Sequence, residues 1–336
     1  KYAELRLADP AAQGRVSAAL GTAYLAKAQL DRARQTFESA TAAAPDDLDA
    51  RLGLARVKFF ANDLDGAERE LAPVLEKHPN KAEAYVLQAQ IMLARDQADR
   101  AVEALTAAVR SQPDSASYRY DLVTLLLRQN KAEEAKAQIE EMRRIAPDAP
   151  ATHYLTALIA HREGRDAEAR DAVRLALRGA PDFLPAHMLA GSVMYRLGDH
   201  AQAQLSLNKV LERVPRHLQA RQLLAMSLLQ SAQAARALET LKPLIDAEPQ
   251  DARSLMVIGQ ALLANGEFEA AADYFSRASS QAPDSAGARM RLGMARMVGG
   301  DSAQGLADLE AATNLDGTGI QADASLELAH LRGRNY

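Results

Sequence analysis

The chain has 336 residues, no cysteine and a formal net charge of −4. The lack of cysteine excludes thiol catalysis, disulfides and thiolate metal sites, and without a basic excess the chain has no electrostatic footprint for nucleic acid. Hydrophobic residues make up 48% of the chain but aromatic residues only 4%. This composition favours closely packed helices over sheet, and no apolar run is long enough to predict a transmembrane segment.

The strongest signal is a set of prolines that recur every 34 residues: Pro45, Pro79, Pro113, Pro147, Pro181, Pro215, Pro249 and Pro283. A fixed period of this length indicates a solenoid of helix-turn-helix repeats, in which each unit packs on its neighbours. We place each proline at repeat position 32. Helix A is then predicted over positions 2–14 and helix B over positions 18–31.

In chain order, residues 1–13 are expected to end a preceding repeat, with Pro10 at its position 32. Nine repeats are expected to follow, at residues 14–47, 48–81, 82–115, 116–149, 150–183, 184–217, 218–251, 252–285 and 286–317. Residues 318–336 are expected to form helix A of a tenth, truncated repeat. The predicted fold class is therefore all-α, an α-α superhelix of about nine repeats with partial repeats at both ends.

Three columns of this alignment hold one size of side chain. Position 20 is small throughout: Ala33, Ala67, Ala101, Ala135, Ala169, Ala203, Ala237, Ala271 and Gly305. Position 24 is large and apolar throughout: Phe37, Leu71, Leu105, Ile139, Val173, Leu207, Leu241, Phe275 and Leu309. Position 8 is small except for Val123: Gly21, Ala55, Ala89, Ala157, Gly191, Ala225, Gly259 and Gly293. Such columns predict two helices that approach closely and interlock.

Turn and cap residues recur with the same period. Gly and Asn near position 15 are predicted to end helix A in the left-handed conformation: Asn62, Asn130, Gly164, Gly198, Gly266 and Gly300. Acidic or amide residues after position 32 are predicted to be the N-caps of the next helix A: Asp46, Asn80, Asp114, Asp148, Asp182 and Asp284.

These columns, with Pro at position 32, resemble the tetratricopeptide repeat (TPR) signature over nearly the whole chain. The resemblance implies a binding scaffold with a protein or peptide partner in a concave groove. It also implies that helix A positions 2, 5, 9, 12 and 13 line that groove.

Two groups of side chains fall on those groove positions. The first is a basic and aromatic stripe of Arg128, Arg162, Arg196, Tyr120, Tyr154, His161 and Tyr195. Such a stripe suits an acidic peptide or a sugar polymer, although the arginines could equally solvate a helix edge. The second is methionine-rich: Met188, Met226, Met256, Met290, Met294 and Met297. These residues predict an adaptable surface for an apolar peptide, or alternatively packing against neighbouring helices.

No catalytic constellation is found: the chain has no G-x-S-x-G, H-E-x-x-H, Walker loop or C-x-x-C motif. His153 and His187 share position 4, where the family places a packing residue, so packing is favoured over metal binding. We therefore expect neither enzymatic activity nor a cofactor or metal ion.

Segment 186–245, with GTAYLAKAQLDRARQTFESA near the start and QADASLELAHLR at the end, resembles the TPR-repeat lipoprotein of PEP-CTERM/exosortase exopolysaccharide systems. This resemblance implies a periplasmic scaffold in a Gram-negative envelope, lipid-anchored through a segment outside this sequence, with proteins of the polysaccharide machinery or the polysaccharide itself as partners. Two alternatives stay open. The chain could be a cytoplasmic adaptor that binds a peptide tail, or an accessory domain of a larger polysaccharide-export or enzyme chain.

Overall fold

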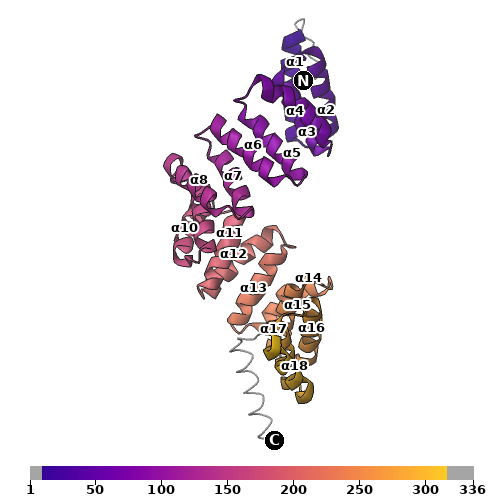
Figure 1. Ribbon diagram of the computed structural model, residues 1–336, viewed down its shortest axis with the longest axis vertical. Coiled ribbons are helices and arrows are strands. Elements are labelled where there is room, and N and C mark those ends of the chain that lie inside the picture. The colour runs from indigo at the N-terminus through magenta and orange to yellow at the C-terminus, as the bar shows by residue number, and fades with distance from the viewer. Residues whose placement is uncertain (1–9, 316–336) are drawn as a thin grey trace. The chain divides into compact units, whose positions relative to one another are not determined.

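The computed structural model describes residues 10–315, and in that range the backbone is helical with no strand (Figure 1). The helices of the first half are α1 (Pro10–Ala26), α2 (Leu30–Ala43), α3 (Leu48–Phe60), α4 (Leu64–Lys77), α5 (Ala82–Ala94), α6 (Ala98–Ser111), α7 (Ala116–Arg128), α8 (Ala132–Ile145) and α9 (Pro150–Arg162). Those of the second half are α10 (Asp166–Gly179), α11 (Leu184–Arg196), α12 (His200–Arg213), α13 (Leu218–Gln230), α14 (Ala234–Ile245), α15 (Ala252–Ala264), α16 (Phe268–Gln281), α17 (Ala286–Val298) and α18 (Ser302–Leu315).

The chain divides into two compact units, residues 1–159 and 160–336, which meet in sequence near the end of α9. Within the first unit consecutive helices pack on each other from the pair α1 and α2 to the pair α7 and α8. Within the second unit they do so from the pair α10 and α11 to the pair α17 and α18. The helices thus form consecutive helix-turn-helix pairs, which confirms the predicted all-α repeat fold.

Of the two expected partial repeats, only residues 10–13 lie within the described range. Helix α1 begins at Pro10, so residues 10–13 belong to the first helix A rather than to the end of a preceding repeat. Proline suits this first helical position, because its missing N–H would have no partner inside the helix. The other residues of the two expected partial repeats, 1–9 and 318–336, lie outside the described residues.

The size columns form the core. Every alanine at position 20 is fully buried, and the large residues at position 24 are at most 4% exposed. Position 24 fills the space that position 8 leaves open in the same repeat. A Cβ atom placed on Gly259 would lie 2.6 Å from the Phe275 ring, and one on Gly191 would lie 2.6 Å from Leu207. The predicted interlocking of small and large columns is confirmed.

Each turn between helix A and helix B uses one residue in the left-handed region. The predicted Asn and Gly residues all have positive φ: Asn62, Asn130, Gly164, Gly198, Gly266 and Gly300. The same repeat position also has positive φ at three residues that were not predicted to adopt it, Ala28, Asp96 and Ala232. All nine turns therefore share one backbone conformation, which the packing of the helices imposes whether or not the residue favours it.

The N-caps of helix A stand one residue later than predicted. The side chains that accept hydrogen bonds from the first turn of helix A stand at position 34: Asp47, Ser115, His217, Asp251 and Ser285. The proline and the residue after it both belong to the turn that precedes the helix. Asp46, one of the predicted caps, instead forms an ion pair with Lys77, and this partner lowers the pKa of the Asp46 carboxyl.

A side chain at position 4 ties several of these turns to the following helix. The residue at position 4 donates to the proline carbonyl six residues before it, at Arg51, Arg119 and Arg221, and a ring nitrogen of His187 makes the same contact at 2.7 Å. The acceptors are Pro45, Pro113, Pro215 and Pro181, respectively. Position 4 thus supplies a donor to the preceding turn, a role beyond the packing predicted for His187.

Candidate functional site

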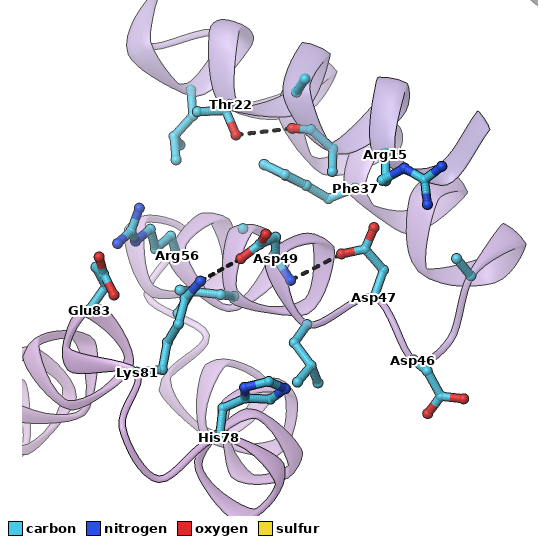
Figure 2. Close-up of a pocket in the computed structure, with 17 residues that line it drawn as sticks. Arg15, Thr22, Phe37, Asp46, Asp47, Asp49, Arg56, His78, Lys81 and Glu83 are labelled. Carbon is cyan, nitrogen blue, oxygen red and sulfur yellow. Dashed lines mark hydrogen bonds and ion pairs between the residues drawn. The ribbon is translucent and has the colours of Figure 1, made fainter. Parts of the chain in front are cut away.

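A pocket of about 880 Å³ lies in the first unit, on the helix A side of the first three repeats (Figure 2). Its lining includes Arg15, Ala18, Thr22 and Leu25 of α1, Asp49, Leu52 and Arg56 of α3, and Glu83 of α5. These residues occupy repeat positions 2, 5, 9 and 12, which are four of the five positions expected to line the groove. We call this cavity the N-terminal pocket.

The base of the N-terminal pocket is apolar because the interlocked core reaches it. Phe37 of α2 is 1% exposed, and its ring fits between Gly21 and Gly53; a Cβ at Gly53 would lie 2.2 Å from the ring. Leu52 and Ala18 are also buried beside the cavity. A ligand here would contact hydrocarbon below and polar side chains around it.

Most of the acidic side chains at the rim already have a partner. The Lys81 ammonium lies 2.7 Å from an Asp49 carboxylate oxygen, and this hydrogen bond raises the pKa of Lys81. The Asp47 carboxylate caps α3 by accepting from the backbone N–H groups of Asp49 and Ala50, each at 3.1 Å (Figure 2). Lys77 holds Asp46 in the same way, so two of these carboxylates have their charge offset by a lysine.

Two arginines in the pocket lining, in contrast, have no such partner. Neither Arg15 nor Arg56 forms a hydrogen bond or ion pair with another residue in the range 10–315. They come from successive A helices, α1 and α3, and both line the N-terminal pocket (Figure 2). Guanidinium groups bind carboxylates through paired hydrogen bonds, so this pair could hold an acidic group above the apolar base.

The N-terminal pocket was not predicted, although its polar residues can be found in the sequence. Arg15, Asp49 and Glu83 stand at position 2 of three successive repeats, and Arg56 stands at position 9. The basic stripe stands out in the sequence because three arginines share position 13, whereas the pocket combines unlike side chains at several positions. Its volume depends on how far the helices stand apart, and a sequence column does not report that separation.

The predicted stripe is distributed over both units. In the first unit, the rings of Tyr120 and Tyr154 lie 6.3 Å apart between centroids and are tilted by 37°. Arg128 is exposed and has no hydrogen-bond or ion-pair partner among the described residues. In the second unit, Arg162 is exposed, and the Tyr195 ring lies 5.6 Å from that of His200.

Two other members of the stripe are held in a hydrogen-bonded chain in the second unit. His161 Nδ1 lies 2.5 Å from Asp166, and its Nε2 lies 2.9 Å from the Ser192 hydroxyl. Arg196 lies 2.8 Å from the other Asp166 oxygen and donates to the His161 carbonyl at 3.1 Å. These contacts join the last turn of α9 and the start of α10 to α11, and they engage the exposed Arg196 guanidinium within the chain.

The hydrogen-bonded sequence Ser–His–Asp of a hydrolase triad is present at Ser192, His161 and Asp166. Acyl transfer also requires donors that stabilise an oxyanion, and these are missing. Ser192 lies in the interior of α11, where the neighbouring backbone N–H groups are donors within the helix and cannot stabilise an oxyanion. The arrangement can position two repeats against each other and shows no means of stabilising a tetrahedral intermediate.

The methionines divide into packed and exposed residues. Met188, Met226 and Met256 are half-buried and pack against the core of the second unit. Met290 and Met297 are also half-buried, whereas Met294 is 41% exposed. Packing thus accounts for the first three, and Met294 is the methionine of this group that presents most surface to solvent.

Neither a membrane-spanning helix nor a metal cluster is found in the part of the chain that the structure describes. No helix there is long and apolar enough to span a membrane. No group of three or more His, Asp or Glu side chains there is arranged to hold a metal ion. His153 and His187 therefore do not belong to a metal cluster within the described range.

Family models of the tetratricopeptide repeat match residues 24–91, 92–159, 186–217, 223–286 and 258–320. The chain belongs to the tetratricopeptide repeat family. The matches fall in both units, and the N-terminal pocket therefore lies on the helix A face of a TPR array. No curated protein matches the sequence significantly.

Solved structures agree with this fold. PilF of Pseudomonas aeruginosa superposes with a TM-score of 0.56 at 18% identity, over 65% of this chain and 99% of that one. A tetratricopeptide repeat protein of Parabacteroides merdae gives a TM-score of 0.53 at 17% identity, over 74% and 98%. The APC/C Cut9–Hcn1 complex gives 0.53 at 14% identity, over 96% of this chain and 70% of that one. At these identities the likeness establishes the fold alone.

Proposed function

We propose that this TPR protein is a non-catalytic scaffold that binds an extended, acidic segment of a partner protein in the N-terminal pocket. The observation that carries the proposal is the pair Arg15 and Arg56. Two guanidinium groups without internal partners line one cavity of about 880 Å³. TPR proteins are typically protein-interaction scaffolds, and a peptide is the ligand that a groove built from successive A helices can follow.

The apolar base adds selectivity to this electrostatic attraction. A peptide with only carboxylates would gain the contacts to Arg15 and Arg56, which salt screens because they are near the surface. A segment that also carries an apolar side chain would cover Leu25 and Leu48, which are half-buried in the lining, and displace water from the cavity. The preferred ligand therefore combines acidic residues with one or two apolar residues.

A phage-displayed library of random dodecapeptides tests the proposal directly. We expect the wild type to enrich peptides that carry acidic and apolar residues, and a synthetic member of that set to bind at least about tenfold more weakly to Arg15→Glu and to Arg56→Glu. Arg34→Glu on α2 is the matched control, because Arg34 is exposed and lies outside the pocket. Peptide enrichment that is identical in wild type and both pocket variants would refute the proposal.

The cellular setting is a second proposal, and it rests on the sequence resemblance of segment 186–245. In this proposal the protein works in the periplasm of a Gram-negative envelope and organises exopolysaccharide assembly or export, or PEP-CTERM protein sorting. Fractionation of the producing cells, followed by detection with an antibody, tests the location. Recovery in the cytoplasmic fraction would favour the cytoplasmic adaptor instead.

A further inference from the structure

A carboxylate occupies an unusual place on α7. Asp121 stands at repeat position 6, where the preceding and following repeats bury Leu87 and Leu155 at 1% and 0% exposure. In the first two repeats, the residues at position 6, Ala19 and Gly53, line the N-terminal pocket. The position thus belongs to the inner surface of helix A, and Asp121 places a negative charge on it.

Asp121 has no partner for that charge. It is half-buried and forms no hydrogen bond or ion pair with another residue between 10 and 315. Its oxygens are not among the sealed, unsatisfied atoms of the protein, so a ligand can reach them. Burial raises the pKa of the Asp121 carboxyl, because desolvation disfavours the charged form. An unpartnered carboxylate in this setting lowers the stability of the free protein until a cation approaches it.

Aromatic rings stand beside this carboxylate. Tyr120 is its neighbour on α7, and the Tyr120 and Tyr154 rings are 6.3 Å apart. Burial raises the pKa of both Tyr118 and Tyr120, and the charge of Asp121 adds to each shift. The Asp121 carboxylate therefore lies within electrostatic range of Tyr118 and Tyr120, and the Tyr154 ring lies beside that of Tyr120. Tyrosine faces attract cations, and a carboxylate provides the opposite charge and the hydrogen-bond acceptor.

We propose that Asp121, Tyr120 and Tyr154 form a subsite for a basic side chain, lysine or arginine, of the peptide that occupies the N-terminal pocket. The inference rests on the proposed peptide-binding function and adds a second determinant to it. Charge complementarity carries the choice of occupant. Arg15 and Arg56 offer unpaired positive charge on the first two repeats, whereas Asp121 offers an unpaired negative charge on the fourth. The bound segment is therefore acidic at one end and basic at the other.

The same random dodecapeptide library tests this subsite when it is selected in parallel on wild type, Asp121→Asn and Asp114→Asn. Asparagine keeps the shape of the side chain and removes its charge, and Asp114 is an exposed aspartate in the turn before α7. We expect wild type and Asp114→Asn to enrich peptides with a lysine or arginine at a fixed spacing from the acidic residues. Asp121→Asn is expected to retain the acidic preference and to lose the basic one.

Synthetic peptides make the comparison quantitative. Replacing the basic residue by alanine is expected to weaken binding to wild type by at least about tenfold and to leave binding to Asp121→Asn unchanged. Failure of the library to enrich any peptide would overturn the proposed function and the subsite together. Enrichment of acidic peptides with no basic preference, or a basic preference that survives in Asp121→Asn, would overturn the subsite alone. Melting curves of the three proteins show whether each variant is folded.

Discussion

At the scale of single residues, the core of this protein is a set of matched volumes at repeat positions 8 and 24. Both phenylalanines at position 24 face a glycine, Phe37 against Gly21 and Phe275 against Gly259. Where position 8 is alanine, position 24 is leucine or valine. Because interiors are close-packed, a methyl group added on one side requires the other side to become smaller.

Gly259→Ala is expected to destabilise the protein by about 1–3 kcal/mol, because the new Cβ would overlap the Phe275 ring. Phe275→Leu makes room, so the double variant should lose less stability than the sum of the two single changes. Urea denaturation followed by circular dichroism measures all three. Gly287→Ala in α17 is the control, since its Cβ would meet only the end of Arg291 at 3.4 Å. Additive losses would contradict the volume match.

Asp121→Asn is expected to stabilise the protein at neutral pH, by about 1 kcal/mol, because it removes a desolvated charge without a partner. The raised pKa of Asp121 gives the pH dependence. As pH falls from neutrality, the folded wild type takes up this proton before the unfolded chain does, so its penalty disappears. The advantage of Asp121→Asn should therefore shrink towards pH 4. Denaturation at several pH values measures it, and an advantage that grows on acidification would contradict this account.

These two residue-scale features differ in how far the sequence predicts them. The volume match could be predicted because it recurs in eight of the nine repeats, with Val123 as the one large residue at position 8. Asp121 breaks its column, and a lone carboxylate at an apolar position is compatible with an ion pair to any neighbouring helix. Only the structure shows that no described residue provides that partner.

At the scale of elements, the nine turns between helices A and B share one left-handed residue while their sequences differ. Helix packing fixes the turn, and the residue type then sets how much strain it stores. Glycine adopts this conformation without strain, whereas alanine costs about 1–2 kcal/mol there. For this reason the sequence predicts the six Gly and Asn turns and is silent about Ala28, Asp96 and Ala232.

Ala232→Gly is expected to raise the free energy of unfolding by about 1 kcal/mol, since the native φ of 55° becomes unstrained. The reciprocal change, Gly266→Ala, is expected to lower it by a similar amount, and no atom lies within 4 Å of the new Cβ. Thermal melting compares them. Ala235→Gly, at an exposed site inside α14, controls for the general cost of glycine and should be destabilising. If Ala232→Gly also destabilises, the turn is not strained.

At the scale of the whole molecule, stability should be distributed along the array because each helix contacts mainly the helices next to it in the chain. In such a protein the free energy of folding is a sum over repeats and their interfaces. The sequence predicted this architecture from its period. It did not predict the N-terminal pocket, because that cavity is made by three repeats together and no single column contains it.

Removing the two last repeats, residues 252–317, is expected to lower the free energy of unfolding and the denaturant m-value. The remaining repeats are expected to stay folded. Circular dichroism per residue and urea titration measure this loss. The peptide contacts of the N-terminal pocket should persist in the shortened protein, since α1, α3 and α5 are retained. Complete loss of helicity would indicate a single cooperative domain in place of an additive array.

The donors at position 4 have a consequence for protein engineering. Arg51, Arg119, His187 and Arg221 each contact a proline carbonyl that belongs to the repeat before their own. In a chimaera joined just after the proline, the proline carbonyl and its position 4 donor would come from different proteins. If the grafted module has leucine at position 4, the carbonyl loses its donor. A splice in the turn between helix A and helix B keeps the proline and its donor in one exchanged cassette. The repeat position at which two modules are joined, and not only the number of repeats exchanged, should therefore decide whether modules from different TPR proteins can be recombined.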